Sequence, residues 1–369
     1  MKKLGFGCMR LPMAEGSSKL IDKAQFCRMI DTFLANGFSY FDTAWVYAGS
    51  EEAIRECLVQ RHPRSSFLLA DKMPMQIVDQ EQQVDAYFNK QLERCGVDYF
   101  DYYLAHDMGL QRYETAKDIH LFAYMAEMKK AGRIRNIGFS FHDTAEVLEK
   151  ILMERPEVDF VQLQLNYLDW ENPSIQSAKC LEIAKKYAKP VVVMEPVKGG
   201  TLAKLPAEAE KKLRAVHPAM SNASWAIRFA ASQDNVMLVL SGMSSMAQME
   251  DNISYMKSFV PLNAREHAVI EEITGAINES IAIPCTGCAY CTPGCPMSIP
   301  IPRYLWLYNA DLQELKEKTF TAQGNVYAHL TRHHARPNDC IGCGRCEEMC
   351  PQHLPIRELL ATVGNYFKR

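Results

Sequence analysis

Over roughly the first 280 residues, short runs of β-branched and aromatic residues alternate with longer stretches in which apolar positions recur every three or four residues. The short runs are typical of buried strands, and the longer period is typical of amphipathic helices. The predicted strands are Leu4–Gly7, Phe38–Phe41, Phe67–Ala70, Tyr102–Ala105, Asn136–Phe139, Phe160–Leu165, Val191–Met194 and Met237–Leu240. The predicted helices are Asp22–Asn36, Ser50–Arg61, Glu81–Cys95, Thr115–Ala131, Thr144–Glu154, Ser174–Tyr187, Asn222–Gln233 and Ala247–Met256.

Eight strands, each followed by a helix, are the composition of a (β/α)₈ TIM barrel. A doubly wound open sheet is the alternative, but no Gly-x-Gly-x-x-Gly follows the first strand. A further predicted helix, Ala264–Ser280, leads to residues 281–284, where we place the domain boundary. We therefore expect an α/β barrel over residues 1–280 and a small, mostly helical domain over residues 281–369.

Composition excludes several classes of protein. The formal net charge of −3 suggests neither nucleic acid nor an anionic membrane as a partner. No apolar run reaches the length of about 18 residues that a transmembrane helix needs. The first residues, MKKLGFGCMRLPM, lack the long apolar stretch of a secretory signal. We expect a cytoplasmic protein.

Two runs with the same cysteine spacing lie near the carboxyl end of the chain, and each reads C-x2-C-x2-C-x3-C followed by proline. This is the bacterial ferredoxin spacing for [4Fe–4S] ligands. Zinc is the alternative, but zinc sites usually pair two distant C-x2-C motifs. We therefore expect a ferredoxin-like domain with two [4Fe–4S] clusters, held by Cys285, Cys288, Cys291, Cys295, Cys340, Cys343, Cys346 and Cys350.

In two-cluster ferredoxins, the last cysteine of each run ligates the cluster of the other run. By that rule Cys350 would join the first three cysteines of the first run, and Cys295 would join those of the second. A domain of this size has too little core without its clusters, so we expect metal binding to be coupled to folding. The remaining cysteines are predicted to be reduced and mostly buried: Cys8, Cys27, Cys57, Cys95 and Cys180.

Residues with useful chemistry stand at or after the ends of most predicted strands: Asp42, Lys72, His106, Ser140, Asn166 and Glu195. In a (β/α)₈ barrel, this end of the strands carries the active site. Considered alone, Asp42 suits a helix N-cap, Tyr47 a half-buried loop aromatic, and His106 a hydrogen-bonded core histidine. Their occurrence together with Lys72 at successive strand ends favours a catalytic site.

Several of these segments resemble the aldo/keto reductase family. The resemblance rests on Phe41-Asp-Thr-Ala-Trp-Val-Tyr47, on strands ending in Lys72 and in Leu-Ala-His106, and on Gly-Arg-Ile-Arg-Asn-Ile-Gly-Phe-Ser140. It spans roughly residues 1–280, and the whole chain is similar to a subgroup of oxidoreductases in which this barrel is fused to a ferredoxin-like tail. The resemblance implies hydride transfer between a nicotinamide cofactor and a carbonyl or alcohol substrate.

The resemblance implies that Tyr47 is the general acid, that Lys72 activates it, that Asp42 partners Lys72, and that His106 orients the substrate carbonyl. Tyrosine, with a pKa near 10, is a poor acid at neutral pH. A neighbouring ammonium favours the phenolate and lowers such a pKa by about 1–3 units. A neutral imidazole can donate a hydrogen bond to the oxygen on which charge develops. Other residues compatible with a substrate pocket are Trp45, Asp107 and His142.

The nicotinamide contacts implied by the resemblance are Ser140, Gln162, Asn166, Met194, Gly242, Met243, Ser244, Gln248 and Asn252. Ser140 and Gln162 would hold the carboxamide of the nicotinamide. Phe141 replaces an asparagine usual in the family, and Met194 replaces a tyrosine that stacks on the nicotinamide. Ser244 and Ser245 stand where a cation usually holds the 2′-phosphate of NADPH, and no cation is nearby in the sequence. A phosphate without such a partner binds weakly, so we expect NADH to bind at least as well as NADPH.

Two further hypotheses remain open. Hydride carries two electrons whereas a cluster exchanges one, so a flavin or radical step would have to connect them, and no flavin motif is visible. The clusters would either stabilise the tail or relay electrons. In the second hypothesis, they reduce a substrate in the barrel without nicotinamide, which Phe141, Met194 and the missing cation favour. In the third, the chain is a non-enzymatic redox or electron-transfer subunit, against which the four predicted catalytic residues argue.

The basic segment from Arg332 to Arg336 suits an acidic electron carrier of the ferredoxin or flavodoxin type, with a solvated loop as the alternative.

Overall fold

The computed structural model describes residues 2–17, 20–171, 175–280, 282–314, 327–328, 330–332 and 334–368. The chain forms two compact units, Met1–Val197 with Ala219–His267, and Lys198–Pro218 with Ala268–Arg369. The second unit therefore takes in a segment from the middle of the chain. The predicted division into domains at residues 1–280 and 281–369 does not anticipate this segment, and it stays a prediction.

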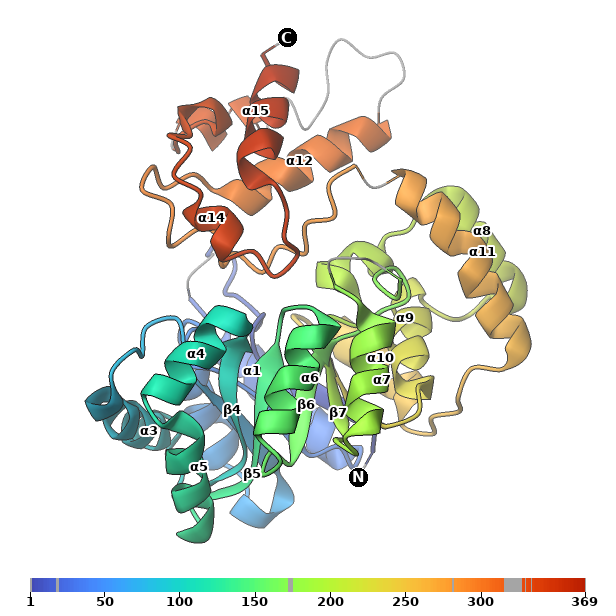
Figure 1. The fold of residues 1–369 in the computed structure, drawn as a ribbon. Coiled ribbons are helices and arrows are strands. Elements are labelled where there is room, and N and C mark those ends of the chain that lie inside the picture. Colours follow the sequence, from blue (N-terminus) through green and yellow to red (C-terminus); the bar gives the residue numbers. More distant parts are fainter. Residues whose placement is uncertain are drawn as a thin grey trace. The chain divides into compact units, whose positions relative to one another are not determined.

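Parallel strands close into a barrel in the first unit, in the order β1 to β8 (Figure 1). They are β1 (Leu4–Gly7), β2 (Tyr40–Asp42), β3 (Leu68–Met73), β4 (Phe100–Met108), β5 (Ile134–Phe141), β6 (Phe160–Gln164), β7 (Val191–Met194) and β8 (Val236–Ser241). Strands of such a barrel are covered on both faces, which explains their nearly continuous apolar sequences. The predicted (β/α)₈ barrel is confirmed, and the ends of its strands differ from the predicted ends by up to three residues.

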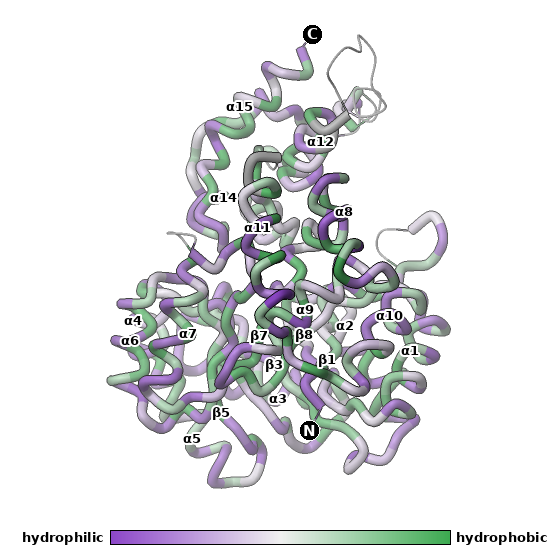
Figure 2. The backbone as a smooth tube through the Cα atoms, turned by 90° about the vertical axis from the view of Figure 1, so that its right-hand side faces the viewer, coloured by the Kyte–Doolittle hydropathy of each residue, from purple (hydrophilic) through white to green (hydrophobic). Residues whose placement is uncertain are grey.

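The helices of the first unit are α1 (Lys23–Ala35), α2 (Ser50–Ile54), α3 (Glu81–Cys95), α4 (Leu110–Asp118), α5 (Leu121–Lys130), α6 (Ala145–Glu154), α7 (Ser177–Lys186), α9 (Asn222–Ser232) and α10 (Met246–Met256). Hydrophobic and hydrophilic residues alternate along them, as Figure 2 shows. In α6 the buried residues are Ala145, Leu148, Ile151 and Leu152, which share one helical face. Burying one leucine or isoleucine side chain contributes about 1.5–3 kcal/mol.

Two predicted helices differ from the observed ones. The stretch Thr115–Ala131 forms α4 and α5 instead of one helix, because His120 between them has a φ of 51°, outside the right-handed helical region. The stretch Ser50–Arg61 begins as α2 and continues as a π-helical turn over Arg55–Val59. Three residues used in the predictions lie outside the described residues: Ser174 of a predicted helix, Ile281 at the predicted boundary and His333 of the basic segment.

The remaining helices are α8 (Ala207–Val216), which the sequence analysis did not predict, α11 (Ala264–Ser280), α12 (Ile301–Glu314), α14 (Arg345–Glu348) and α15 (Ile356–Tyr366). In the second unit, an apolar core that includes Ile299, Tyr304 and Leu360 surrounds the buried thiols of Cys291 and Cys346. A mostly helical region that holds both cysteine runs is therefore present, as predicted. Among the described residues, no helix has the length and apolar character needed to cross a membrane.

Candidate functional site

Lys72 is fully buried near the carboxyl end of β3. Its Nζ lies 2.5 Å from Asp42 Oδ1 and donates a hydrogen bond to the carbonyl oxygen of Thr43 at 2.7 Å. Gln162 Nε2 donates to the other carboxylate oxygen of Asp42 at 3.0 Å. Asp42 pairs with Ala70 in the β2–β3 register, so Lys72, two residues further, projects to the same inward face. The ion pair and its added hydrogen bonds compensate the cost of burying both charges.

Tyr47 and His106 lie beside this ion pair. Lys72 Nζ is 4.9 Å from the centroid of the Tyr47 ring. The rings of Tyr47 and His106 are edge to face, with centroids 5.9 Å apart and planes at 85°. The structure thus brings the four predicted catalytic residues together at the carboxyl ends of β2, β3 and β4. Their chemical roles stay predictions.

The imidazole of His106 is only 2% exposed. Burial holds the pKa of His106 well below its usual range, and the positive charges of Lys72, His142 and Arg112 lower that pKa further. The ring is therefore neutral at neutral pH, and a neutral imidazole carries one N–H donor. This state is the one required for the predicted hydrogen bond to a substrate oxygen.

Arg112 and Gln76 belong to this region, and the sequence analysis missed both. Arg112 Nη1 lies 3.1 Å from Asp107 Oδ2, to which Gln76 Nε2 also donates at 3.2 Å. Asp107 has a φ of 57°, a left-handed conformation that is uncommon outside glycine. Its N–H donates to Ser140 Oγ at 2.7 Å. Asp107, predicted as a pocket residue, therefore links the strand of His106 to Ser140.

The other two predicted pocket residues have different surroundings. His142 Nδ1 lies 2.9 Å from Gln164 Oε1 on β6. Trp45 packs against α3, where its ring meets Tyr87 at 4.8 Å between centroids and the Arg94 guanidinium at 4.3 Å. A pocket role for Trp45 stays a prediction without support from these contacts.

Ser140 lies near the carboxyl end of β5, Met194 ends β7, and Gln162 is the middle residue of β6. Contacts of these residues with a nicotinamide stay predictions. Gln164, two residues beyond Gln162, is 5% exposed, and within the described part of the chain its Nε2 has no hydrogen-bond partner. A buried donor without a partner marks a position where a ligand acceptor is expected. Gln164 Nε2 is therefore suited to donate to a bound carbonyl or carboxamide oxygen.

Asn166, another predicted cofactor contact, is fully buried. Its Nδ2 donates to Asp169 Oδ2 at 2.8 Å and to the Glu195 carbonyl at 3.1 Å. Its Oδ1 accepts from the N–H groups of Leu168 and Asp169, at 3.1 and 2.9 Å. These bonds use the whole hydrogen-bonding capacity of the amide, so Asn166 shapes the loop after β6. A cofactor contact through this side chain stays a prediction.

The predicted contacts after β8 organise the loop that leads into α10. Gly242 directly follows the strand, and Met243 is fully buried. The N–H of Ser244 donates to Gln248 Oε1 at 2.7 Å. Asn252 Nδ2 donates to Ser241 Oγ, also at 2.7 Å. These bonds fix the loop, and cofactor contacts by these residues stay predictions.

Arg10, in the loop after β1, lies beside this segment. Ser244 Oγ donates to the Arg10 carbonyl at 2.8 Å, and Arg10 Nη1 is 4.0 Å from the place of a Cβ built on Gly242. Arg10 Nη2 is 3.7 Å from Glu195 Oε1. No cation lies near Ser244 in the sequence, but the fold brings Arg10 to Ser244. The two residues are 234 positions apart, and they meet because β1 pairs with β8 when the barrel closes.

Four cysteines from both runs gather in one part of the second unit. Burial raises the pKa of the Cys291 thiol, and the neighbouring thiol groups of Cys288, Cys285 and Cys350 raise that pKa further. These three thiols therefore lie close to Cys291. In the described part of the chain, none of the cysteines forms a disulfide.

The other four cysteines surround a pocket. Cys295 lines it together with Cys340, Cys343 and Cys346, and its remaining walls include Ile301 and Leu360. The last cysteine of each run thus lies with the first three of the other, the arrangement expected for two-cluster ferredoxins. The two sets of four thiols fit [4Fe–4S] ligation, and the set that includes Cys295 lines a largely apolar pocket.

Comparison with known proteins identifies both parts of the chain. The model of the aldo/keto reductase family matches residues 3–274, and the model of the 4Fe-4S dicluster domain matches residues 284–355. Aldo-keto reductase str7 of Strobilurus tenacellus is 29% identical over 215 residues, which are 55% of this chain and 60% of the relative. An aldo-keto reductase of Mycolicibacterium smegmatis is 32% identical over 116 residues, which are 31% of this chain and 40% of the relative. The chain thus spans only part of the curated relatives it matches.

Solved structures share the barrel. The holo form of an aldo-keto reductase from Bacillus halodurans superposes with a TM-score of 0.57 at 24% identity, over 73% of this chain and 91% of that chain. An aldo-keto reductase of Klebsiella pneumoniae in complex with NADPH superposes with a TM-score of 0.58 at 18% identity, over 74% of this chain and 90% of that chain. The region around the cysteine runs is a 4Fe-4S dicluster domain. Because its family model spans most of the sequence, the chain belongs to the aldo/keto reductase family.

Proposed function

We propose that this protein is an oxidoreductase that transfers hydride between a nicotinamide cofactor and a carbonyl or alcohol substrate, with Tyr47 as the general acid. The observation that carries the proposal is the buried Lys72–Asp42 ion pair, whose ammonium lies 4.9 Å from the Tyr47 ring centroid. The ring of His106 completes the group. A binding module has no need for an ammonium buried between a carboxylate and a tyrosine.

In the direction of reduction, the nicotinamide supplies a hydride to the carbonyl carbon when it is bound. The neutral imidazole of His106 donates a hydrogen bond to the carbonyl oxygen, where negative charge develops. Tyr47 gives its hydroxyl proton to that oxygen, and the ammonium of Lys72 stabilises the phenolate that remains. Asp42 offsets the positive charge of Lys72, so that the ammonium is stable in its buried position.

Arg10 supports a phosphate-bearing cofactor in this barrel. Its guanidinium lies next to Gly242, in the loop that Ser244 anchors. Guanidinium groups bind phosphate through charge-assisted hydrogen bonds, so Arg10 supplies the charge that the segment after β8 lacks. The Klebsiella pneumoniae structure, which holds NADPH, has the same fold. Arg10 therefore removes the reason to expect a preference for NADH, and both cofactors are candidates.

We infer that the second unit binds two [4Fe–4S] clusters, one held by the first three cysteines of the first run with Cys350, the other by those of the second run with Cys295. The grouping of the thiols supports this assignment. Such clusters supply one-electron transfer. A ferredoxin-type or flavodoxin-type protein is the partner class that would exchange electrons with them.

Reduction driven by the clusters without nicotinamide is the second candidate function. The observation that favours it is the bonding of two predicted nicotinamide contacts. Gln162 donates to Asp42, and Asn166 uses its whole amide within the loop after β6. Under this hypothesis the same four residues, Asp42, Tyr47, Lys72 and His106, would protonate a substrate that is reduced in single-electron steps.

One experiment tests the first function against the second. The anaerobically purified protein is titrated with NADH and NADPH beside a panel of aldehydes and ketones, and nicotinamide absorbance and cluster bleaching are followed together. We expect carbonyl-dependent oxidation of nicotinamide in the wild type. Tyr47→Phe should lower the turnover number about 10²–10⁴-fold and leave the dissociation constant of the cofactor nearly unchanged.

Tyr87→Phe is the matched control. Tyr87 of α3 packs on Trp45, which lies in the same loop as Tyr47, and this substitution should not change turnover. Wild-type turnover by Tyr47→Phe would contradict the role assigned to Tyr47. Substrate reduction with a chemically reduced cluster and no nicotinamide would favour the second function.

A further inference from the structure

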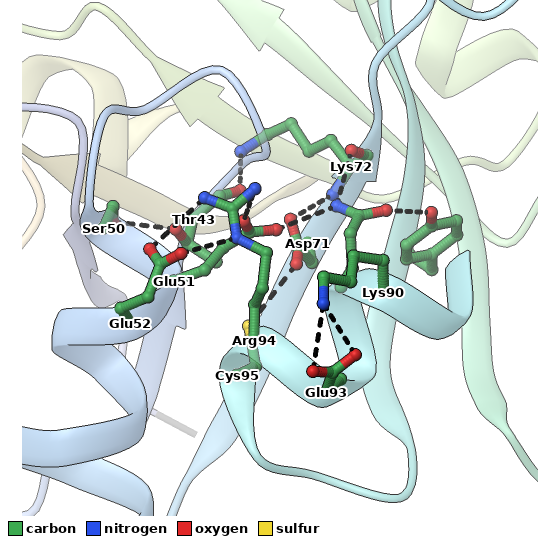
Figure 3. Close-up of polar contacts among 12 residues, drawn as sticks. Thr43, Ser50, Glu51, Glu52, Asp71, Lys72, Lys90, Glu93, Arg94 and Cys95 are labelled. Atoms are coloured by element: carbon green, nitrogen blue, oxygen red, sulfur yellow. Dashed lines mark hydrogen bonds and ion pairs between the residues drawn. The ribbon is translucent and has the colours of Figure 1, made fainter. Parts of the chain in front are cut away.

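A buried polar network lies behind Lys72, on the outer side of β3. Successive side chains of a strand point to opposite faces, so Asp71 faces α2 and α3 while Lys72 faces the barrel interior. Figure 3 shows Asp71 between Glu51 of α2 and Cys95 of α3. Glu51, Asp71, Gln91, Cys95 and Tyr103 are all fully buried. Burying so many polar groups costs free energy unless each of them forms a hydrogen bond. Two of these side chains bond the backbone of one residue.

That residue is Lys72, whose peptide groups lie beyond the end of the neighbouring strand. The last rung between β2 and β3 pairs Asp42 with Ala70, so β2 offers no partner for the N–H and C=O of Lys72. The N–H of Lys72 donates instead to Asp71 Oδ1 at 2.7 Å. Gln91 Nε2 donates to the Lys72 carbonyl at 3.0 Å. Two side chains therefore take the place of the missing strand.

A second layer holds Gln91 in place. Tyr103 donates its hydroxyl proton to Gln91 Oε1 at 2.5 Å, and Gln91 Nε2 also donates to Glu51 Oε1 at 3.2 Å. Arg94 Nη1 pairs with Glu51 Oε2 at 2.8 Å. Both ends of the Gln91 amide are thus fixed, and rotation of this side chain would break a bond at each end.

The charge state of the network is set by the closeness of its acids. One carboxylate oxygen of Glu51, one of Asp71 and the sulfur of Cys95 all lie within 4.8 Å of one another. Burial raises the pKa of Asp71 well above its usual range, and the negative charge of Glu51 raises that pKa further. This shift favours the neutral carboxyl form of Asp71, while Arg94 pairs with Glu51. A neutral Asp71 keeps the network close to electroneutral while its Oδ1 still accepts from Lys72.

We propose that Gln91, Asp71 and Glu51 are positioning residues for Lys72. They hold the peptide of Lys72 so that its ammonium stays between Asp42 and Tyr47. The inference rests on the proposed function, since it gives a role to the backbone of the residue that activates Tyr47. A displacement of about 1 Å at a catalytic group costs about 10²-fold in rate, which is the scale of effect we expect.

Gln91→Leu is the principal test, because leucine has a similar size but cannot bond the Lys72 carbonyl. We expect the turnover number to fall about 10–100-fold, with an unchanged dissociation constant for the cofactor. The basic limb of the pH profile of turnover should move to higher pH, because an ammonium held less closely stabilises the Tyr47 phenolate less. A role in stability alone would lower the unfolding temperature without moving this limb.

Two further variants keep the test decisive. Gln91→Asn is one methylene shorter and less disruptive to folding than leucine, and it should move the basic limb in the same direction. Glu93→Gln, in the exposed pair with Lys90 on the same helix, is the control and should change neither quantity (Figure 3).

The outcomes separate this inference from the proposed function. If Gln91→Leu does not fold, Gln91→Asn decides by the same two readings. Wild-type turnover and a wild-type pH profile in the folded Gln91 variants would overturn the positioning role and leave the proposed function standing. A wild-type protein that reduces no carbonyl with nicotinamide would overturn the proposed function first.

Discussion

Gly199→Ala should cost the second unit one of its clusters, because Gly199 packs against the first cysteine run. Gly199 has a φ of 64°, and a Cβ at this residue would lie 1.8 Å from the carbonyl oxygen of Thr286, which directly follows Cys285. The adjacent Lys198 is buried and donates to Gln352 Oε1 at 3.2 Å, two residues beyond Cys350. These contacts reach Thr286 and Gln352, which lie within two residues of two ligands of the same proposed cluster.

The size of the effect follows from this geometry. Ordinary contact with a Cβ begins at 3.4 Å, so the Thr286 carbonyl has to move by more than an ångström. Overfilling a packed site costs about 1–3 kcal/mol, and the left-handed backbone costs alanine about 1–2 kcal/mol. The combined cost of about 2–5 kcal/mol opposes cluster loading, because metal binding and folding are coupled in a small metal domain.

Gly200→Ala is the matched control. Gly200 has a φ of 103°, and among the described residues no atom outside its chain neighbours lies within 4 Å of its Cβ position. This variant therefore carries backbone strain without the collision. The assay is iron and sulfide content with low-temperature electron paramagnetic resonance of the reduced, anaerobically purified proteins. We expect about eight irons per chain in the wild type and in Gly200→Ala, and about four in Gly199→Ala. Full iron content in Gly199→Ala, or an equal loss in both variants, would refute the reasoning.

Three other predictions follow from the site. Cys350→Ser should remove the cluster of the first cysteine run and about half of the iron, and loss of the other cluster instead would contradict ligation across the two runs. Arg10→Met should weaken binding of NADH and NADPH about 10–100-fold in fluorescence titrations, the value of a charge-assisted hydrogen bond of about 1.5–3 kcal/mol, and unchanged binding would separate Arg10 from the phosphates. Because the pKa of His106 is lowered in the folded state, the unfolded chain binds a proton first as the pH falls below about 6.5, and the free energy of unfolding should decrease from there downward. His106→Gln should lose this part of the pH dependence in denaturant titrations, and an unaltered dependence would show that the folded imidazole titrates normally.

Much of the architecture was predictable from local sequence alone. The run that forms β7 is apolar throughout, and that of β6 is apolar except for Gln162 and Gln164, because barrel strands are covered on both faces. The spacing of Cys285, Cys288 and Cys291 was equally informative, because three of the four ligands of such a cluster come from one short turn of the chain. That the four predicted catalytic residues lie close together was predictable, because strand ends in a closed barrel all meet at one face.

Tertiary structure decided the contacts between residues far apart in the chain. Arg10 and Ser244 meet only because β1 pairs with β8, and no local sequence pattern predicts this pairing of two distant strands. Gln91 serves the Lys72 carbonyl only because β2 stops at Asp42, a difference in strand length that periodicity does not report. The segment Lys198–Pro218 joins the second unit for the same kind of reason, since it follows a barrel strand in the chain and yet packs with the cysteine runs. Apolar periodicity specifies which face of an element is buried, whereas the partner that covers it depends on how the elements close in three dimensions.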